Sequence, residues 1–164
     1  MENSVLLKQV EALAQKLDGE FEESLGTPVL KIKGARIMEA LQAAKNFSGA
    51  PCDFLHDLTA VDYPDRNEIE VVYHLTSLKG PQMLRIKGIV DRDNAAIDTA
   101  VNIWPGADFM ERECFDLMGV RFNGHPDLKR ILLWDDFEGH PLRKDYITPS
   151  VEERKRLRIM QPGE

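Results

Sequence analysis

Three segments of the chain show the apolar spacing of an amphipathic helix. In the first, leucine and valine residues recur at intervals of four, three and four, which places them on one face of a helix. The third segment is followed by Gly119, and glycine is the residue that most often follows the end of a helix. A single helical turn is expected over residues 98–104, before Pro105. The three predicted helices span residues 5–17, 36–47 and 106–118.

Five other segments show the pattern of β-strands. Residues 69–76 alternate strictly, with apolar side chains at the odd positions and Glu70, Val72 and His74 at the even ones. Residues 83–90 alternate in the same way. Tight turns join these two segments to each other and to the strand before them, so the three are expected to form an antiparallel meander. The predicted strands span residues 20–24, 29–33, 54–63, 69–76 and 83–90.

The division of the strands into one apolar and one polar face predicts the layer architecture. A sheet of this kind buries a single face, so the helices are expected to cover one side only. The sequence therefore predicts a two-layer α+β fold with a mostly antiparallel sheet and helices on one face. A chain of 164 residues is long enough for one such domain. We expect residues 1–120 to form the core and residues 121–164 to form an extended, irregular arm of the same structural unit.

The regular apolar pattern fails in the predicted arm, where prolines and glycines recur. The arm is nevertheless too rich in large apolar side chains to be a solvated linker. Because residues 5–118 already supply a core, we expect the surface of a partner to bury these side chains. The large apolar residues of the arm are Ile131, Leu132, Leu133, Trp134, Phe137, Leu142 and Tyr146.

Charge and composition narrow the function classes. The net charge of −7 argues against a nucleic-acid partner, because phosphate binding depends on Lys and Arg. Residues 1–120 carry 12 basic and 20 acidic groups, net −8, and residues 121–164 carry 9 and 8, net +1. We find neither a signal-peptide pattern nor an apolar run of the ~18 residues that a membrane-spanning helix needs. We therefore expect a soluble, cytoplasmic chain whose association with a membrane comes through a partner.

The third predicted helix carries the densest cluster of charges. Arg112 and Asp116 stand four residues apart and are expected to pair across one turn. Glu113 lies beside the apolar stripe: a solvated acidic helix end is favoured, and partial burial beside a charged partner is the alternative. Glu111 and Glu113 are two residues apart and point to different sides of a helix, which excludes a shared catalytic carboxylate pair.

Histidine and cysteine are the remaining candidates for chemistry. Two Gly-His-Pro tripeptides, each followed by a leucine and two basic residues, present His125 and His140 on extended segments. A metal site would need further ligands nearby, so hydrogen-bonding anchors for docking to another protein are the favoured interpretation. Cys52 and Cys114 form no motif and are interpreted as buried thiols. The alternative is a free-standing enzyme with a reactive Cys114 and a histidine within reach.

The run Glu-Arg-Glu-x-x-Asp-Leu-Met at residues 111–118, followed by His125, Lys129 and Ile-Leu at 131–132, resembles the signature of one family. This family is the 30 kDa subunit of the respiratory NADH:quinone oxidoreductase, complex I. Residues 135–146 resemble the carboxyl-terminal segment of that family, and residues 54–63 and 104–108 match its general pattern. The resemblance covers residues 50–146 well and the first 50 in outline.

The resemblance implies a cofactor-free subunit of the quinone module of complex I, with no catalytic residue of its own. Such a subunit braces the quinone-pocket subunit, which forms the pocket together with a neighbour that holds the terminal iron–sulfur cluster. Both are expected partners, and iron–sulfur clusters, flavin, NADH and quinone belong to partner subunits. It implies a peripheral position on the cytoplasmic side of the cell membrane. The equivalent subunit of a membrane-bound [NiFe] hydrogenase or formate hydrogenlyase-type complex is the alternative. The residues expected to contact partners or support the interface are Glu111, Arg112, Glu113, Asp116, His125, Lys129, Trp134, His140, Arg143, Lys144 and Asp145.

Overall fold

The helices lie where the apolar spacing predicts them. The computed structural model describes residues 2–49, 51–80, 82–148 and 150. The first helix begins three residues before its predicted start, and the third ends at Met118, followed by Gly119 in the left-handed conformation with φ of 70°. Two short 3-10 turns, Gly34–Arg36 and Pro64–Arg66, come directly before the second helix and shortly before the fourth strand. The helices are α1 (Glu2–Leu17), α2 (Ile37–Lys45) and α3 (Ala107–Met118).

Five strands form the main sheet, in the order β1-β2-β5-β4-β3. The predicted meander is confirmed, because β3, β4 and β5 pair antiparallel in sequence. The first two strands form an antiparallel hairpin, and β2 then pairs parallel with β5, an arrangement that the strand pattern did not predict. The strands are β1 (Glu20–Ser24), β2 (Thr27–Lys33), β3 (Phe54–Tyr63), β4 (Glu68–Thr76) and β5 (Met83–Asp91).

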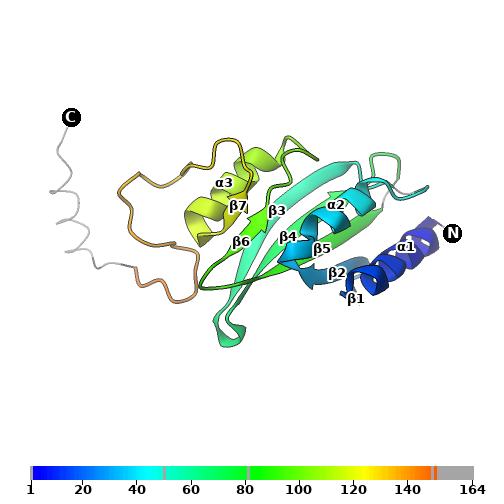
Figure 1. Ribbon diagram of the computed structural model, residues 1–164, viewed down its shortest axis with the longest axis horizontal. Helices are drawn as coiled ribbons and strands as arrows, with labels where there is room; N and C mark the ends of the chain where they lie inside the picture. The colour runs from blue at the N-terminus through cyan, green and yellow to red at the C-terminus, as the bar shows by residue number, and fades with distance from the viewer. Residues whose placement is uncertain (1, 50, 81, 149, 151–164) are drawn as a thin grey trace.

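All three helices bury their apolar faces against one face of this sheet, as predicted. Leu6 of α1, Leu41 of α2 and Met118 of α3 share one core cluster with Tyr73 and Ile86 of the sheet. Figure 1 shows α1 beside β1 and β2, α2 over β5, and α3 beside β3. The fold is therefore a two-layer α+β domain with a mostly antiparallel sheet.

The opposite face of the sheet is covered by its own charged side chains. Val29 and Val72 are buried on this face, although none of the described helices covers it. The stems of long basic side chains shield such apolar positions while their charged ends stay at the surface. The basic ends pair across the strands: Lys87 with Glu70 at 3.0 Å, and Lys31 with Glu22 at 2.8 Å. This face therefore neutralises much of its own charge.

A second, two-stranded sheet was not predicted. The strands β6 (Ala96–Asp98) and β7 (Arg121–Asn123) pair parallel on either side of α3 in the sequence. The predicted helical turn over residues 98–104 is wrong at its start, because Asp98 belongs to β6. The turn is confined to the residues after it, where the Trp104 amide donates to the Ala100 carbonyl at 2.9 Å. Strands of three residues are too short to show a periodic pattern.

Residues 124–148 contain no helix or strand and form most of the described part of the arm, which begins with the three residues of the last strand, Arg121–Asn123. They lie at the α3 end of the molecule, away from α1 (Figure 1). The predicted arm also includes residues 149 and 151–164, which lie outside the described residues. The boundary predicted at residue 120 stays a prediction, although Phe122 of β7 is buried with the core. Within the described parts of the chain, no helix is long and apolar enough to cross a lipid bilayer.

Candidate partner-binding site

Asp116 fastens the beginning of the arm to α3. Its side chain is fully buried, and one carboxylate oxygen accepts hydrogen bonds from three consecutive backbone amides, those of residues 131, 132 and 133, at 2.8–3.0 Å. The other oxygen accepts from Arg130 at 2.8 Å. Burial alone would raise the pKa of Asp116, but these four hydrogen bonds to the charged form outweigh it and lower the pKa. The charged carboxylate thus anchors residues 130–133 of the arm to α3.

The arm also closes the C-terminal end of α3. The last carbonyls of a helix have no partner within the helix and need one elsewhere. Here a ring nitrogen of His140 lies 3.1 Å from the Asp116 carbonyl, the Leu142 amide donates to the Leu117 carbonyl at 3.1 Å, and Arg143 donates to the Met118 carbonyl at 2.8 Å. The positive charge of Arg143 also suits the negative end of the helix dipole.

Gly119 gives His140 the room to lie against the helix end. A Cβ atom at Gly119 would lie 2.5 Å from the His140 ring, closer than any real contact. The positive φ of this residue is also strained for any side chain. The predicted glycine cap therefore serves two purposes: it ends α3 and it admits the arm.

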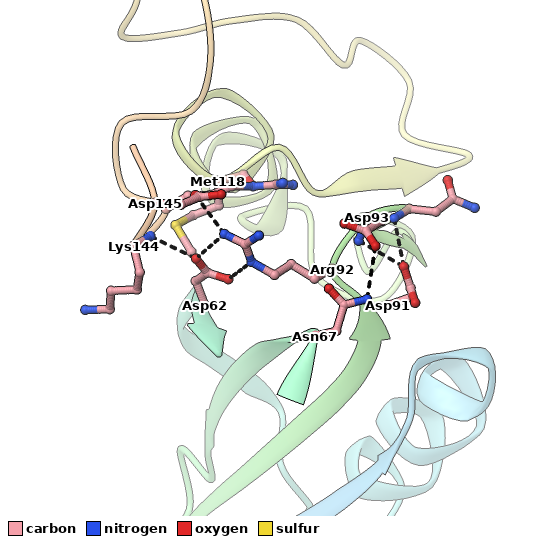
Figure 2. Close-up of polar contacts among 10 residues, drawn as sticks. Asp62, Asn67, Asp91, Arg92, Asp93, Met118, Lys144 and Asp145 are labelled. Carbon is pink, nitrogen blue, oxygen red and sulfur yellow. Dashed lines mark hydrogen bonds and ion pairs between the residues drawn. The ribbon is translucent and has the colours of Figure 1, made fainter. Parts of the chain in front are cut away.

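A third attachment joins the arm to the sheet (Figure 2). Asp62, at the end of β3, accepts two hydrogen bonds from Arg92 at 2.6 and 3.0 Å and one from the Lys144 amide at 2.8 Å. Arg92 also forms an ion pair with Asp145 at 2.7 Å. The bond from Arg92 is the main reason that the pKa of Asp62 is lowered, and Arg92 lowers the pKa of Asp145 as well. We call Asp62, Arg92 and Asp145 the clasp.

Glu111 is the second fully buried carboxylate of α3. It accepts hydrogen bonds from the Thr99 hydroxyl and the Ala100 amide, both at 2.6 Å. Within the described residues no lysine or arginine pairs with it. Burial raises the pKa of Glu111, and the two hydrogen bonds only partly oppose this. Glu111 therefore ties α3 to the loop after β6 and takes no part in holding the arm.

The apolar side chains of the arm are divided between packed and exposed ones. The ring of Phe137 lies edge-on to Trp134, with centroids 4.8 Å apart, and stacks on Tyr146 at 6.0 Å. Trp134 is nevertheless 53% exposed, and Leu132 and Leu142 are exposed to a similar extent. The three attachments thus order the arm, while part of its apolar surface remains open to solvent.

Several predicted residues of α3 lie differently from the expectation. The predicted pair between Arg112 and Asp116 is wrong: Asp116 binds Arg130, and Arg112 donates to the carbonyls of Lys129 and Arg130 at 3.2 and 3.3 Å. Arg130 is the preferred partner of Asp116 because the three backbone amides that follow Arg130 also donate to this carboxylate. Glu113 is exposed, so the favoured interpretation of a solvated acidic residue is confirmed.

Both histidines contact the backbone of their own chain. Besides the contact of His140, the buried side chain of His125 places Nε2 3.3 Å from the Asp108 carbonyl, and its Nδ1 accepts from the Asp127 amide at 3.0 Å. Lys129 is 63% exposed and pairs with Asp127 at 2.8 Å. Contacts of these residues with another protein stay a prediction.

The structure disfavours a thiol enzyme. Cys114 is 4% exposed, and burial raises the pKa of its thiol well above the usual range. Burial raises the pKa of Cys52 to about 12. A reactive cysteine needs the opposite, an accessible thiol with a lowered pKa. Across the described part of the chain, no group of three or more His, Cys, Asp and Glu side chains is placed to hold a metal ion.

Comparison with known proteins identifies the family. The model of the family described as respiratory-chain NADH dehydrogenase, 30 Kd subunit, matches residues 30–152. The chain belongs to this family. The match includes every signature residue of α3 and the described arm up to residue 148.

Relatives of the 30 Kd subunit share most of their length with this chain. An NADH-quinone oxidoreductase subunit of Moorella thermoacetica is 47% identical over 129 residues, which cover 79% of this chain and 86% of the relative. The same subunit of Trichlorobacter lovleyi is 41% identical over 141 residues, covering 80% and 86%. These relatives confirm the resemblance to the 30 kDa subunit that the signature indicated.

Two solved structures have a similar fold. A chain of the membrane-bound sulfane sulfur reductase, an archaeal respiratory membrane complex, has a TM-score of 0.74 at 27% identity, with 96% of this chain and 94% of that chain covered. The trypsin-resistant fragment of Nqo5 has a TM-score of 0.64 at 27% identity, covering 78% of this chain and the whole fragment. The fold is therefore shared by more than one kind of respiratory complex.

Proposed function

We propose that this chain is a structural subunit of the quinone module of a proton-translocating NADH:quinone oxidoreductase. It braces the quinone-pocket subunit and the neighbour that holds the terminal iron–sulfur cluster. The chain holds no cofactor and carries out no reaction; flavin, iron–sulfur clusters, NADH and quinone belong to its partners. The complex places it at the cytoplasmic side of the cell membrane as a peripheral subunit.

One observation carries this proposal: an arm that is fixed to its own domain still exposes large apolar side chains. Leu132 is 62% and Leu142 is 56% exposed, although their amides are bound to Asp116 and to the Leu117 carbonyl. Exposed apolar groups that are held in place are typical of a protein interface. The family supports the identity of the complex, because its members named above are subunits of NADH-quinone oxidoreductases.

Co-expression with the quinone-pocket subunit and its neighbour from the same organism tests the proposal. We expect the tagged chain to co-purify with both through an interface of more than ~2,000 Å², as in obligate complexes. Leu132→Asp/Leu142→Asp places charges on the exposed side chains without touching the backbone bonds of the arm, and should abolish co-purification while circular dichroism stays unchanged. Co-purification of this variant at the parental level would contradict the proposal.

Metal analysis tests the cofactor part separately. The chain expressed alone should be colourless and free of iron and flavin. Stoichiometric iron in the purified chain would contradict a cofactor-free subunit, whatever the outcome of co-purification.

A second candidate function is the equivalent subunit of a related membrane-bound complex, such as a [NiFe] hydrogenase or a formate hydrogenlyase-type assembly. The similarity to the sulfane sulfur reductase chain, at the higher of the two TM-scores, favours keeping it. A mass-spectrometric inventory of the subunits that co-purify from the native organism discriminates between the two. A hydrogenase large subunit in that inventory would replace the first proposal with the second.

A further inference from the structure

Three exposed apolar side chains belong to the part of the arm that is bound at the C-terminal turn of α3. The amides of Leu132 and Leu142 are bound to two consecutive residues of α3, by the side chain of Asp116 and the carbonyl of Leu117. Trp134 belongs to the same turn, because Arg130 donates both to Asp116 and to the carbonyl of Phe137, whose ring packs on Trp134. We call residues 132–142 the Trp134 turn.

The Trp134 turn is ordered before any partner binds. Asp116 and the end of α3 hold its backbone, and the clasp holds the residues that follow it. Binding through a segment that is already ordered avoids most of the entropy that a flexible segment loses. Tryptophan is one of the side chains enriched among the residues that contribute most to binding at an interface.

Acidic side chains border the exposed tryptophan. Asp135, Asp136 and Glu138 are all exposed, and none forms an ion pair with another described residue. The open sheet face is different, because Glu70 and Glu22 there are neutralised by lysines of neighbouring strands. The Trp134 turn thus combines an apolar centre with an uncompensated negative border. That pattern fits a basic protein surface and opposes an anionic membrane surface.

We propose that the Trp134 turn docks into an apolar pocket on a separate protein chain, that the rim of this pocket carries lysine or arginine, and that Trp134 is the central anchor. This inference rests on the proposed function, since it specifies the surface through which the arm binds. It also separates two surfaces of the molecule: the turn binds a partner through apolar contact and charge, whereas Lys31 and Lys87 of the sheet face pair with Glu22 and Glu70 of the same chain.

Hydroxyl-radical footprinting of the isolated chain and of the complex purified from the native organism tests the location. Trp134 should be oxidised in the isolated chain and about tenfold less in the complex, as expected for a central interface residue. Trp104, which is 6% exposed, is the internal control and should be protected in both. Equal oxidation of Trp134 in the two samples would overturn the proposal.

Photo-crosslinking tests the chemistry of the pocket. A benzophenone-bearing phenylalanine in place of Trp134, in the intact complex, should attach to a peptide of another polypeptide that contains apolar residues with lysine or arginine beside them. A crosslink to a second copy of this chain, to lipid, or to a peptide without basic residues would each overturn it.

Charge reversal tests the border with a matched control. Asp135→Lys/Asp136→Lys/Glu138→Lys should weaken co-purification about tenfold, because like charges then face each other across the interface. Glu11→Lys/Glu20→Lys/Glu23→Lys makes the same change in charge at exposed positions of the α1 end and should leave co-purification unchanged. Equal effects of the two triple variants would show that co-purification depends on net charge and not on the position of these acidic residues, and would contradict the proposal.

The outcomes distinguish this inference from the proposed function. If Trp134 stays accessible while the chain remains in the complex, this inference falls and the proposed function stands. If the chain is absent from the complex, the proposed function itself falls.

Discussion

Two carboxylates of α3, five residues apart, are both fully buried and yet behave in opposite ways. Asp116 binds an arginine and three amides, and its pKa is lowered. Glu111 binds one hydroxyl and one amide, and its pKa is raised by burial. The environment at one end of a helix therefore favours the charged form of an acid, and the environment one and a half turns away favours the neutral form.

The difference follows from what each carboxylate has to hold. Glu111 fixes a loop that is already shaped by β6 and the turn after it, so two hydrogen bonds are enough. Asp116 fixes an arm without regular structure, whose amides have no strand or helix to bind them. A charged acceptor satisfies several such amides at once. The charge at Asp116 is thus part of the scaffold of the arm, whereas the charge at Glu111 is not needed.

The largest effect is expected from Asp116→Asn. The amide group keeps one acceptor oxygen but turns an NH₂ group towards Arg130 or towards the three backbone donors. A buried donor without a partner destabilises a fold, and we expect the free energy of unfolding to fall by about 3 kcal/mol. Urea denaturation measures the loss. Trypsin should also cleave after Arg130 faster than in the parent, because the arm is released.

The matched control is Glu113→Gln on the same helix. Glu113 is exposed, so the same chemical change there should alter the free energy of unfolding by less than ~0.5 kcal/mol. If Asp116→Asn were as harmless as this control, the carboxylate would not be the centre of the arm attachment.

A smaller effect is expected at the clasp. Arg92→Met removes both hydrogen bonds to Asp62 and the ion pair with Asp145, but the Lys144 amide still binds Asp62. We expect a loss of about 2 kcal/mol in the free energy of unfolding, because a buried carboxylate has lost its cation. The double variant Asp62→Asn/Arg92→Met should be more stable than Arg92→Met alone, since no buried charge is left unpaired. Equal stability of the single and double variants would show that Arg92 acts through packing and not through Asp62.

The sequence predicted the helices and the meander because each carries a local apolar period. It did not predict the parallel pairing of β2 with β5, because pairing between distant strands depends on contacts that no local pattern contains. The i,i+4 rule predicted that Asp116 pairs with Arg112, but Asp116 accepts its hydrogen bond from Arg130, fourteen residues away. This tertiary partner is favoured because the backbone amides that follow Arg130 bind the same carboxylate. Rules based on sequence neighbours thus failed where residues distant in the sequence make contact.

The clasp was missed for the same reason, although one signal in the sequence was available. Asp62 follows Leu58 and Ala60 in the core-facing phase of β3, where an acidic residue must have a buried partner. That phase predicts a partner but not its identity, because Arg92 lies 30 residues away and Lys144 lies 82 away. The signature positions of α3 were found by their spacing, but the spacing did not separate Glu111, which holds a loop, from Asp116, which holds the arm.

The smallest effect, and the sharpest test of the comparison, is expected from Glu111→Gln. The amide oxygen can still accept from the Ala100 amide, and the NH₂ group can donate to the Thr99 oxygen, so this second contact is kept with its direction reversed. Because the substitution removes a buried charge without a cation, we expect a gain of about 1 kcal/mol in the free energy of unfolding at pH 8. Asp116→Asn and Glu111→Gln both replace a carboxylate with an amide, and they would then change the free energy of unfolding in opposite directions.

The pH dependence of the two variants separates their causes. The folded-state pKa of Glu111 is raised above its ordinary 4.5, so its contribution to stability is fully present below 4.5 and is lost as the pH rises through the folded-state pKa. The gain from Glu111→Gln should therefore disappear as the pH falls. The pKa of Asp116 is lowered below 3.8, so its contribution is present above 3.8 and is lost as the pH falls through the folded-state pKa. The stability that Asp116→Asn loses should therefore also become smaller in acid, so that one variant approaches the parent from lower stability and the other from higher stability. Denaturation of both variants from pH 8 to pH 3 gives the two curves, and a gain for Glu111→Gln that stays constant over this range would show that packing, and not the buried charge, sets its effect.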